Sequence, residues 1–401
     1  MPLSNKKRII LIKLEPTYGT DAAPATTDAM LCTALNINPL EGSAVQRDLV
    51  RPYFSNDGSI RVENFATVDF ETEVAGSGTA GTVPKWATLL KACNFTETIT
   101  AAAITTLTST AIGALGTTAV TLSAAASAID DFYTGMSIAF DGLSQQYEIV
   151  KYVGATKTAT LSKGLLTAIT ATSTTNIGAN VIYTPNSNFS INVASTSASI
   201  YFNVDGVRHV LLGARGTVSF DLSPKLVPKM KWKFTGLLGT ISDVAQGSPA
   251  ADTSLWQTPV TVSTANTTDI NLLGYTQSVL EKLTIDIVNT VAYRQTLGSE
   301  SVLITDRKPV GAVSLEAGFI TTTQGTILPK DWWTAVKTSA VGTFCVKHGQ
   351  VAGNIVAFSG PKVQFEAPKY SDSNGVLMLD MNIAFIPYGI SGNDELRICC
   401  K

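Results

Sequence analysis

One glycine-rich motif in this chain could bind a phosphate. Residues 76–81 read GSGTAG, follow a predicted strand and precede a predicted helix, which is the order found in dinucleotide-binding folds. Such a site needs a buried parallel strand before the turn, and here that strand alternates with three acids. It also needs an acid at the end of a second strand about 20 residues later, where this chain reads TITAAAITT (98–106). We therefore interpret 76–81 as a plain strand-to-helix connection.

Side chains for metal or acid–base catalysis are scarce. The chain has two histidines, His209 and His348, and contains no HExxH, CxxC, P-loop or G-x-S-x-G motif. Metal or triad catalysis is therefore poorly supported. The neighbouring acids Asp130 and Asp131 favour an exposed turn or a helix start over a carboxylate pair, because adjacent side chains usually point apart. We predict a protein that is not an enzyme and needs no cofactor.

The five cysteines match neither a disulfide framework nor a zinc site. Cys93 and Cys345 lie in apolar segments, so we expect buried thiols there. We expect Cys399 and Cys400 to be exposed, because they lie next to the last residue of the sequence.

Alternating charge marks two predicted strands. Asp69, Glu71 and Glu73 alternate with apolar or small residues, which predicts one packed face and one wet, acidic face. Lys229, Lys231 and Lys233 alternate with Met230, Trp232 and Phe234 in the same manner. The segment 84–94 predicts a short helix with one apolar stripe: Trp86, Leu89, Leu90 and Cys93.

Two long stretches mix charged and apolar residues and predict hairpins. We consider them either flexible surface loops or contacts between subunits. Their candidate contact residues are Arg47, Asp48, Arg51, Tyr53 and Asp57 in the first stretch (45–60), and Arg294, Glu300, Asp306 and Arg307 in the second (293–308).

Composition excludes several classes of protein. Hydrophobic residues make up 45% and charged residues 15% of 401 residues, so the chain can build real cores and is not a disordered polymer. Its net charge of −2 gives no global basic field to hold nucleic acid. We find no apolar run long enough to span a membrane and no signal-peptide core, so we expect assembly in the cytoplasm. The abundance of Val, Ile, Thr, Ser and Gly favours an all-β fold with short helices.

The chain repeats a pattern of elements. TVDFETEVAG (67–76) matches AVSLEAGFIT (312–321), which aligns Glu316 with Glu71, and both are followed by a glycine turn and a Pro-Lys-(Asp)-Trp helix start. We favour a duplication over chance similarity. The predicted domains are a first β-sandwich or barrel in two parts (1–97 and 184–243), an inserted small β-domain (98–183), a linker (244–267) and a second copy of the first domain (268–401).

These segments together resemble a known family. RDLVRPYFSNDGSI (47–60), VDFETEVAGSGTAGTVPKWATLLKACNF (68–95), DGVRHVLLGARGTVSFDL (205–222) and ISGNDELRI (390–398) are similar to the major tail tube proteins of long-tailed, non-contractile bacteriophages. The inserted segment resembles, more weakly, the small β-modules that decorate phage tails.

The resemblance implies a structural virion protein. Tube proteins of this kind form rings whose inner sheets join into one β-barrel, and the rings stack along a tape-measure protein and later conduct DNA without binding it specifically. Tail terminator and distal tail proteins are the implied partners at the ends of the tube. Six tube domains usually complete a ring, so two domains per chain imply a homotrimer with pseudo-sixfold symmetry, and a single domain would imply a homohexamer. We expect a DNA-repelling lumen lined by Asp69, Glu71, Glu73 and Glu316.

Two other functions remain open from the sequence. The chain could be a tail or capsid decoration protein that binds the host surface through its inserted domain. It could also be a phage-borne hydrolase on a β-scaffold, although no convergent acid–base set supports that reading.

Overall fold

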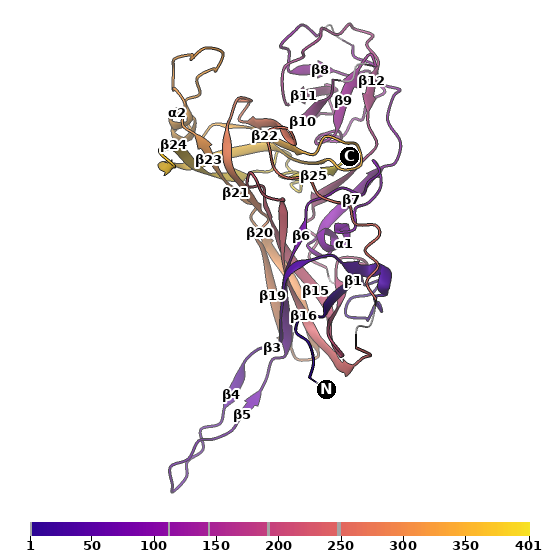
Figure 1. Ribbon diagram of the computed structural model, residues 1–401, viewed down its shortest axis with the longest axis vertical. Helices are drawn as coiled ribbons and strands as arrows, with labels where there is room; N and C mark the ends of the chain where they lie inside the picture. Colours follow the sequence, from indigo (N-terminus) through magenta and orange to yellow (C-terminus); the bar gives the residue numbers. More distant parts are fainter. Residues whose placement is uncertain (1, 111–112, 143–144, 191–192, 247–249) are drawn as a thin grey trace.

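The computed structural model describes residues 2–110, 113–142, 145–190, 193–246 and 250–401. The fold is almost entirely β, with two short α-helices among the described residues. This confirms the predicted all-β class with short helices. Figure 1 shows long strands in the lower body, a second group of strands above them, and a separate small sheet at the top.

The first group of strands comes from both sides of the inserted segment. Its elements are β1 (Arg8–Leu14), η1 (Thr26–Asp28), β2 (Ala29–Met30), β3 (Thr33–Glu41), β6 (Phe65–Glu73), α1 (Ala87–Ala92), β14 (Ala198–Val204), β15 (Val207–Asp221) and β16 (Lys229–Asp243). Its strands pair in the order β1-β14-β15-β16-β6-β3. We call this group unit A.

The second group lies in the last third of the chain. Its elements are β17 (Thr267–Leu272), β18 (Leu280–Asp286), β21 (Val310–Glu316), α2 (Trp332–Lys337), β22 (Val341–His348), β23 (Val356–Ser373), β24 (Val376–Phe385) and β25 (Arg397–Cys400). Six of its strands pair in the order β17-β22-β23-β24-β21-β18. We call this group unit B. In both units the short helix follows the strand that occupies the same place in this order, β6 or β21.

The two units share one sheet and one apolar core. Ser219, Phe220 and Asp221 of β15 pair with β18, so one sheet path runs β3-β6-β16-β15-β18-β21-β24-β23. Alternation decides the buried face: Trp232 and Phe234 of β16 are at most 2% exposed and belong to the core shared by both units. The predicted helix stripe is confirmed, because Trp86, Leu89, Leu90 and Cys93 are all buried.

The inserted segment has a sheet and a core of its own. It enters and leaves through β7 (Phe95–Thr100) and β13 (Asn180–Pro185), which pair with each other. Its five strands are β8 (Ala119–Thr121), β9 (Ser137–Phe140), β10 (Tyr147–Val153), β11 (Thr158–Leu161) and β12 (Thr175–Ile177). They enclose a separate apolar cluster that includes Ile138, Phe140, Ile149 and Tyr152.

The C-terminal strand corrects one expectation. Cys399 and Cys400 are 0% and 4% exposed, not exposed as the sequence suggested. The reason is that β25 is held between β23 and β13, which cover both of its edges. Cys399 packs in the core of the inserted segment and Cys400 in the shared core, so both faces are covered as well. The predicted burial of Cys93 and Cys345 is confirmed.

The predicted linker packs on the body where it is described. Residues 247–249 lie outside the described part of the chain. Beyond them, Val262 is buried in the shared core, and the indole Nε1 of Trp256 donates to the carbonyl oxygen of Ala29 at 3.3 Å.

Candidate functional site: an open sheet face and two hairpin arms

The face of the shared sheet that points away from the core forms one continuous polar surface. Directly opposed residues form a row across five strands: Glu71, Lys231, Ser219, Asp286 and Val310. Because opposed residues in an antiparallel pair lie on the same face, this row carries the open face from unit A into unit B. Alternation along β6 puts Asp69 and Glu73 on the same face as Glu71, and alternation along β21 puts Glu316 there with Val310.

The sequence suggests an acidic face, but the open face carries both signs of charge. Each acid of β6 stands opposite a lysine of β16: Asp69 with Lys233, Glu71 with Lys231 and Glu73 with Lys229. One diagonal pair closes into a salt bridge, with Lys229 Nζ 2.7 Å from Glu71 Oε2. We expected the two charge stripes on separate strands, but only the register of β6 against β16 shows that the stripes neutralise each other.

Partial burial raises the pKa of one acid of β6, Asp69. Burial raises the pKa of Asp69, while the charge of Lys233 lowers it and the charge of Glu41 raises it further. The Asp69 carboxylate is therefore less fully compensated than its pairing with Lys233 alone implies. A salt bridge on the same face is partly exposed: the side chains of Lys231 and Asp221 are 49% and 28% exposed, so this pair contributes less than about 1 kcal/mol to stability.

Glu316 lies apart from the acids of β6. Three strands (β16, β15 and β18) separate β21 from β6. The Glu316 side chain is exposed and lines a hollow of about 160 Å³ together with Val279, Phe319 and Trp332. The four candidate lumen residues thus share a face of one sheet but form two separate groups.

The shared sheet has an unpaired edge at each end of its path. Among the described residues, β3 pairs only with β6. At the other end, β23 beyond Phe365 pairs only with β24. Unpaired strand edges expose rows of backbone N–H and C=O groups that invite another strand.

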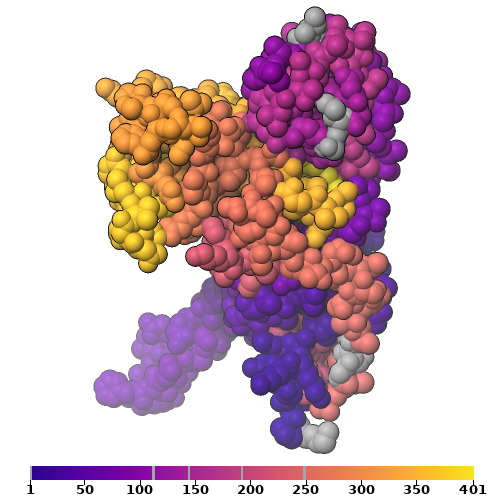
Figure 2. All heavy atoms as spheres, turned by 45° about the horizontal axis from the view of Figure 1, so that its top comes forward, coloured from indigo at the N-terminus to yellow at the C-terminus, as the bar shows by residue number. Residues whose placement is uncertain are grey.

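The first predicted hairpin is an arm that stands clear of the body. Residues 42–64 connect β3 to β6 and contain the short strands β4 (Ala44–Gln46) and β5 (Ser59–Arg61). Figures 1 and 2 show this arm projecting from the lower body. Arg51 Nη2 lies 2.6 Å from Asp57 Oδ1, and the Arg51 guanidinium lies 6.0 Å from the centre of the Tyr53 ring. Arg47 and Asp48 are exposed beside them. We call residues 42–64 arm A.

The second predicted hairpin folds back on its own chain. Residues 287–309 connect β18 to β21 and contain β19 (Asn289–Thr296) and β20 (Ser299–Arg307). Tyr293 stacks on Phe65 of unit A at 4.9 Å between ring centres, and Val302 is fully buried. Arg294 and Glu300 lie near the tip, in the neighbouring strand pairs Arg294–Ser301 and Gln295–Glu300, and both are exposed. We call residues 287–309 arm B.

Arg307 is an internal residue and not a surface contact. Its guanidinium lies 2.6 Å from Glu395 Oε1 and also donates to the carbonyl oxygen of Asn186 and to Asn393 Oδ1. Its side chain is 10% exposed. Asp306, next to it, accepts from the Arg307 backbone N–H at 2.8 Å. Arg307 is internal because β20 ends beside the loop that precedes β25, and the local sequence does not encode this contact.

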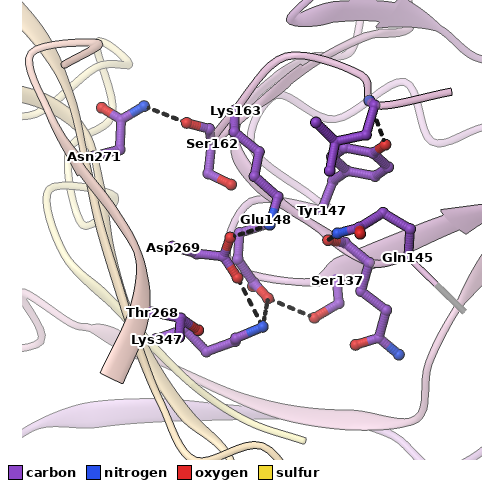
Figure 3. Close-up of polar contacts among 12 residues, drawn as sticks. Ser137, Gln145, Tyr147, Glu148, Ser162, Lys163, Thr268, Asp269, Asn271 and Lys347 are labelled. Carbon is purple, nitrogen blue, oxygen red and sulfur yellow. Dashed lines mark hydrogen bonds and ion pairs between the residues drawn. The ribbon is translucent and has the colours of Figure 1, made fainter. Parts of the chain in front are cut away.

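Sequence reasoning missed a buried ion cluster between the inserted segment and unit B, and Figure 3 shows Glu148, Lys163, Asp269 and Lys347 of this cluster. Glu148 of β10 is fully buried and pairs with Lys401, and Lys347 lies 4.0 Å from it. Asp269 of β17 lies 2.7 Å from Lys347 and 2.5 Å from Lys163. We call these five residues the ion cluster. The signal was present, because Glu148 and Lys347 are isolated charges within apolar runs, YEIV and FCVKH.

Charge pairing within the ion cluster shifts the pKa values of Lys401 and Asp269. Burial alone lowers the pKa of Lys401, but the charge and hydrogen bond of Glu148 outweigh burial and raise that pKa above its usual value. Burial raises the pKa of Asp269, but Lys347 and Lys163 outweigh it and lower that pKa. Lys401 and Asp269 therefore stay charged inside the protein near neutral pH, and removing one partner from such a buried ion pair is costly.

The glycines of GSGTAG allow the backbones of the two units to approach each other closely. The Gly76 N–H donates to Asn354 Oδ1, and the Gly78 N–H donates to the carbonyl oxygen of Gly353, both at 2.8 Å. A Cβ atom on Gly76 would lie 2.0 Å from that same carbonyl oxygen. The motif lies between β6 and α1, as the interpretation of a strand-to-helix connection required.

The buried histidine His348 has structural hydrogen-bond partners. His348 is buried, with Nδ1 3.0 Å from Thr267 Oγ1 and Nε2 3.1 Å from the carbonyl oxygen of Val260. Within the described residues, no group of three or more His, Cys, Asp or Glu side chains could hold a metal ion. Among the same residues, no helix is both long enough and apolar enough to cross a membrane.

No protein-family model matches this chain, and no curated protein matches it either.

Proposed function

We propose that this chain is the repeating structural subunit of a bacteriophage tail tube. In this proposal three copies form a ring, the open sheet faces line its bore, and the rings stack into a hollow conduit for DNA in the virion tail. The chain then has no catalytic role, and its partners are its own copies, a tape-measure protein and the proteins that cap the two ends of the tube.

The observation that carries the proposal is the repeated strand order. Units A and B pair six strands in the same sequence, each with a short helix after the equivalent strand and a hairpin arm between the equivalent pair. The predicted duplication, drawn from weak sequence similarity, gains support from this repeat. A chain with two equivalent units can act as two neighbouring positions in a ring of six.

The junction between the units supports ring closure. Within one chain, β15 of unit A pairs with β18 of unit B. In the repeat, β23 is the equivalent of β15 and β3 is the equivalent of β18. These two strands, β23 beyond Phe365, carry the unpaired edges at the ends of the path β3-β6-β16-β15-β18-β21-β24-β23. Pairing β23 of one copy with β3 of the next repeats the same junction between chains. It also removes both exposed edges, which otherwise favour uncontrolled aggregation.

The open face supports a conduit for DNA. With acids and lysines opposed, the face offers no uniform positive field that would hold phosphates. A bore of this kind would let DNA slide because it lacks net attraction, which differs from the repulsive acidic wall that the sequence suggested.

Negative-stain electron microscopy of purified protein tests this function. We expect rings or tubes that show six inner lobes, two for each chain, and three outer projections, one for each inserted segment. Six projections would retain the tube but contradict the two-unit ring. Monomers at every concentration, also in the presence of preformed tail-tip complexes, would contradict the proposal.

A further inference from the structure

Arm A carries a row of apolar side chains that are left exposed by the described part of the chain. Val50 and Phe54 are fully exposed, and Val45, Tyr53 and Ile60 are 55%, 61% and 56% exposed. Figure 2 shows the arm (purple, lower left) apart from the rest of the molecule. Exposed apolar residues in such number indicate a binding surface.

Arm B shows how the equivalent arm is covered. Asn289 Nδ2 donates to the carbonyl oxygen of Gly216 in β15 at 2.9 Å. Further along the arm, the Val302 N–H donates to the Tyr18 hydroxyl at 2.6 Å, and the Tyr18 ring lies against Gly213. Arm B therefore leaves its own unit beside β15 and runs toward the N-terminal end of that strand, across unit A.

The repeat predicts the path of arm A. In the proposed ring, unit A adjoins unit B of a neighbouring copy, so the surface equivalent to the one that arm B covers belongs to that unit B. Since β23 is the counterpart of β15, arm A should run toward the N-terminal end of β23 in that copy. There Arg397 of β25 stands opposite Ser359 of β23.

A groove of about 430 Å³ opens at that point, between the inserted segment and the loop that precedes β25. Its walls include Ile129, Phe132 and Ile390, which are 66%, 38% and 108% exposed. Arg397 also lines the groove, and its Nε atom is buried without a hydrogen-bond partner among the described residues.

The groove matches arm A in chemistry. Its exposed apolar walls suit Val50 and Phe54. Its charged residues, Asp130, Asp394 and Arg397, suit the exposed Arg47 and Asp48 of the arm, which carry both signs of charge.

We propose that arm A of one copy binds in the groove between the inserted segment and residues 389–394 of the neighbouring copy in the same ring. This inference rests on the proposed ring, and it gives the inserted segment a role in assembly: it forms one wall of the site that receives the arm. The ion cluster would keep this wall in place, because it fixes the inserted segment on unit B.

Cysteine cross-linking in assembled tubes tests the proposal. The double variants Val50→Cys/Ile390→Cys and Phe54→Cys/Ile390→Cys are treated with a short bis-maleimide and separated on denaturing gels. Background from native thiols should be low, since four of the five cysteines are buried, and each single variant measures what remains. The matched control is Leu297→Cys/Ile390→Cys, because Leu297 is as exposed as Phe54 (107% against 110%) but lies at the tip of arm B.

We expect covalent dimers and trimers and no larger species from the two arm A variants, and only monomers from the control. Tubes without cross-linked species would overturn this inference and leave the proposed function intact. A ladder that continues past three would also overturn it, because arm A would then reach another ring. Protein that forms neither tubes nor cross-links would count against the proposed function itself.

Discussion

Replacement of Glu148 by alanine should loosen the inserted segment from unit B. The Glu148 side chain is 0% exposed, and its partner Lys401 is 8% exposed. After the substitution Lys347 keeps Asp269 at 2.7 Å, whereas the Lys401 ammonium loses its acidic partner and keeps the hydroxyl of Ser137 at 2.8 Å. Loss of one partner from a buried ion pair costs about 3–5 kcal/mol, which raises the population of the open state by roughly two to three and a half orders of magnitude.

Hydrogen exchange measured by mass spectrometry suits this prediction, because it reports opening at each strand. We expect protection to fall in β10, β22 and β25, which meet at the ion cluster, and to change little in β3 and β6. The matched control is Asp221→Ala, which removes an acid from the half-exposed pair with Lys231 and should cost less than about 1 kcal/mol.

A triple variant separates charge from packing. Glu148→Leu combined with Lys401→Met and Lys347→Leu leaves Asp269 paired with Lys163, which lies 2.5 Å away. Replacement of buried ion pairs by apolar residues of similar volume is often neutral or stabilising, so we expect protection to recover. If Glu148→Ala is as mild as Asp221→Ala, or if the triple variant is as unstable as Glu148→Ala, the ion cluster does not hold the inserted segment in the way described.

Three further predictions follow from other parts of the structure. Burial lowers the pKa of His348. Its contribution to stability is therefore present above the unfolded pKa of about 6.5 and is lost as pH falls through the folded pKa. The drop in melting temperature from pH 7.5 to pH 5 should be smaller in His348→Gln than in the unchanged protein, and an equal drop would contradict this. Gly353 and Gly375 have similar φ angles of +88° and +83°, but a Cβ atom would lie 2.4 Å from backbone atoms at Gly353 and in open space at Gly375. In urea unfolding we expect Gly375→Ala to lower the free energy of unfolding by about 1–2 kcal/mol and Gly353→Ala to lower it by about 1–3 kcal/mol more. Equal losses in the two variants would exclude a tight contact between the units. Replacement of the three acids of β6 by lysine should leave tubes intact but impair DNA passage, because the bore then gains a uniform positive stripe beside the lysines of β16; normal ejection of DNA by such tubes would show that this face does not line the lumen.

The sequence by itself determined the features that depend on near neighbours. Alternation placed Phe70 and Trp232 in the core and their charged neighbours outside, and the spacing of Trp86, Leu89 and Leu90 predicted the short helix. The hairpins and the repeated order of elements could also be predicted, because turns and strand lengths are local properties. The same local patterns identified the residues of the open face and of both arms as candidates.

Only the tertiary structure decided how these elements face one another. The sequence suggested an acidic face, but the register of β6 against β16 put a lysine opposite each acid. It suggested that Arg307 was a surface contact and that Cys399 was exposed. Arg307 is instead bound by residues of distant loops, and Cys399 is covered by distant strands. The ion cluster joins Glu148 to Lys401 across more than half the length of the chain. Strand register and the packing of distant strands follow from the summed burial of many side chains, so no local pattern around any one of these residues encodes its partner.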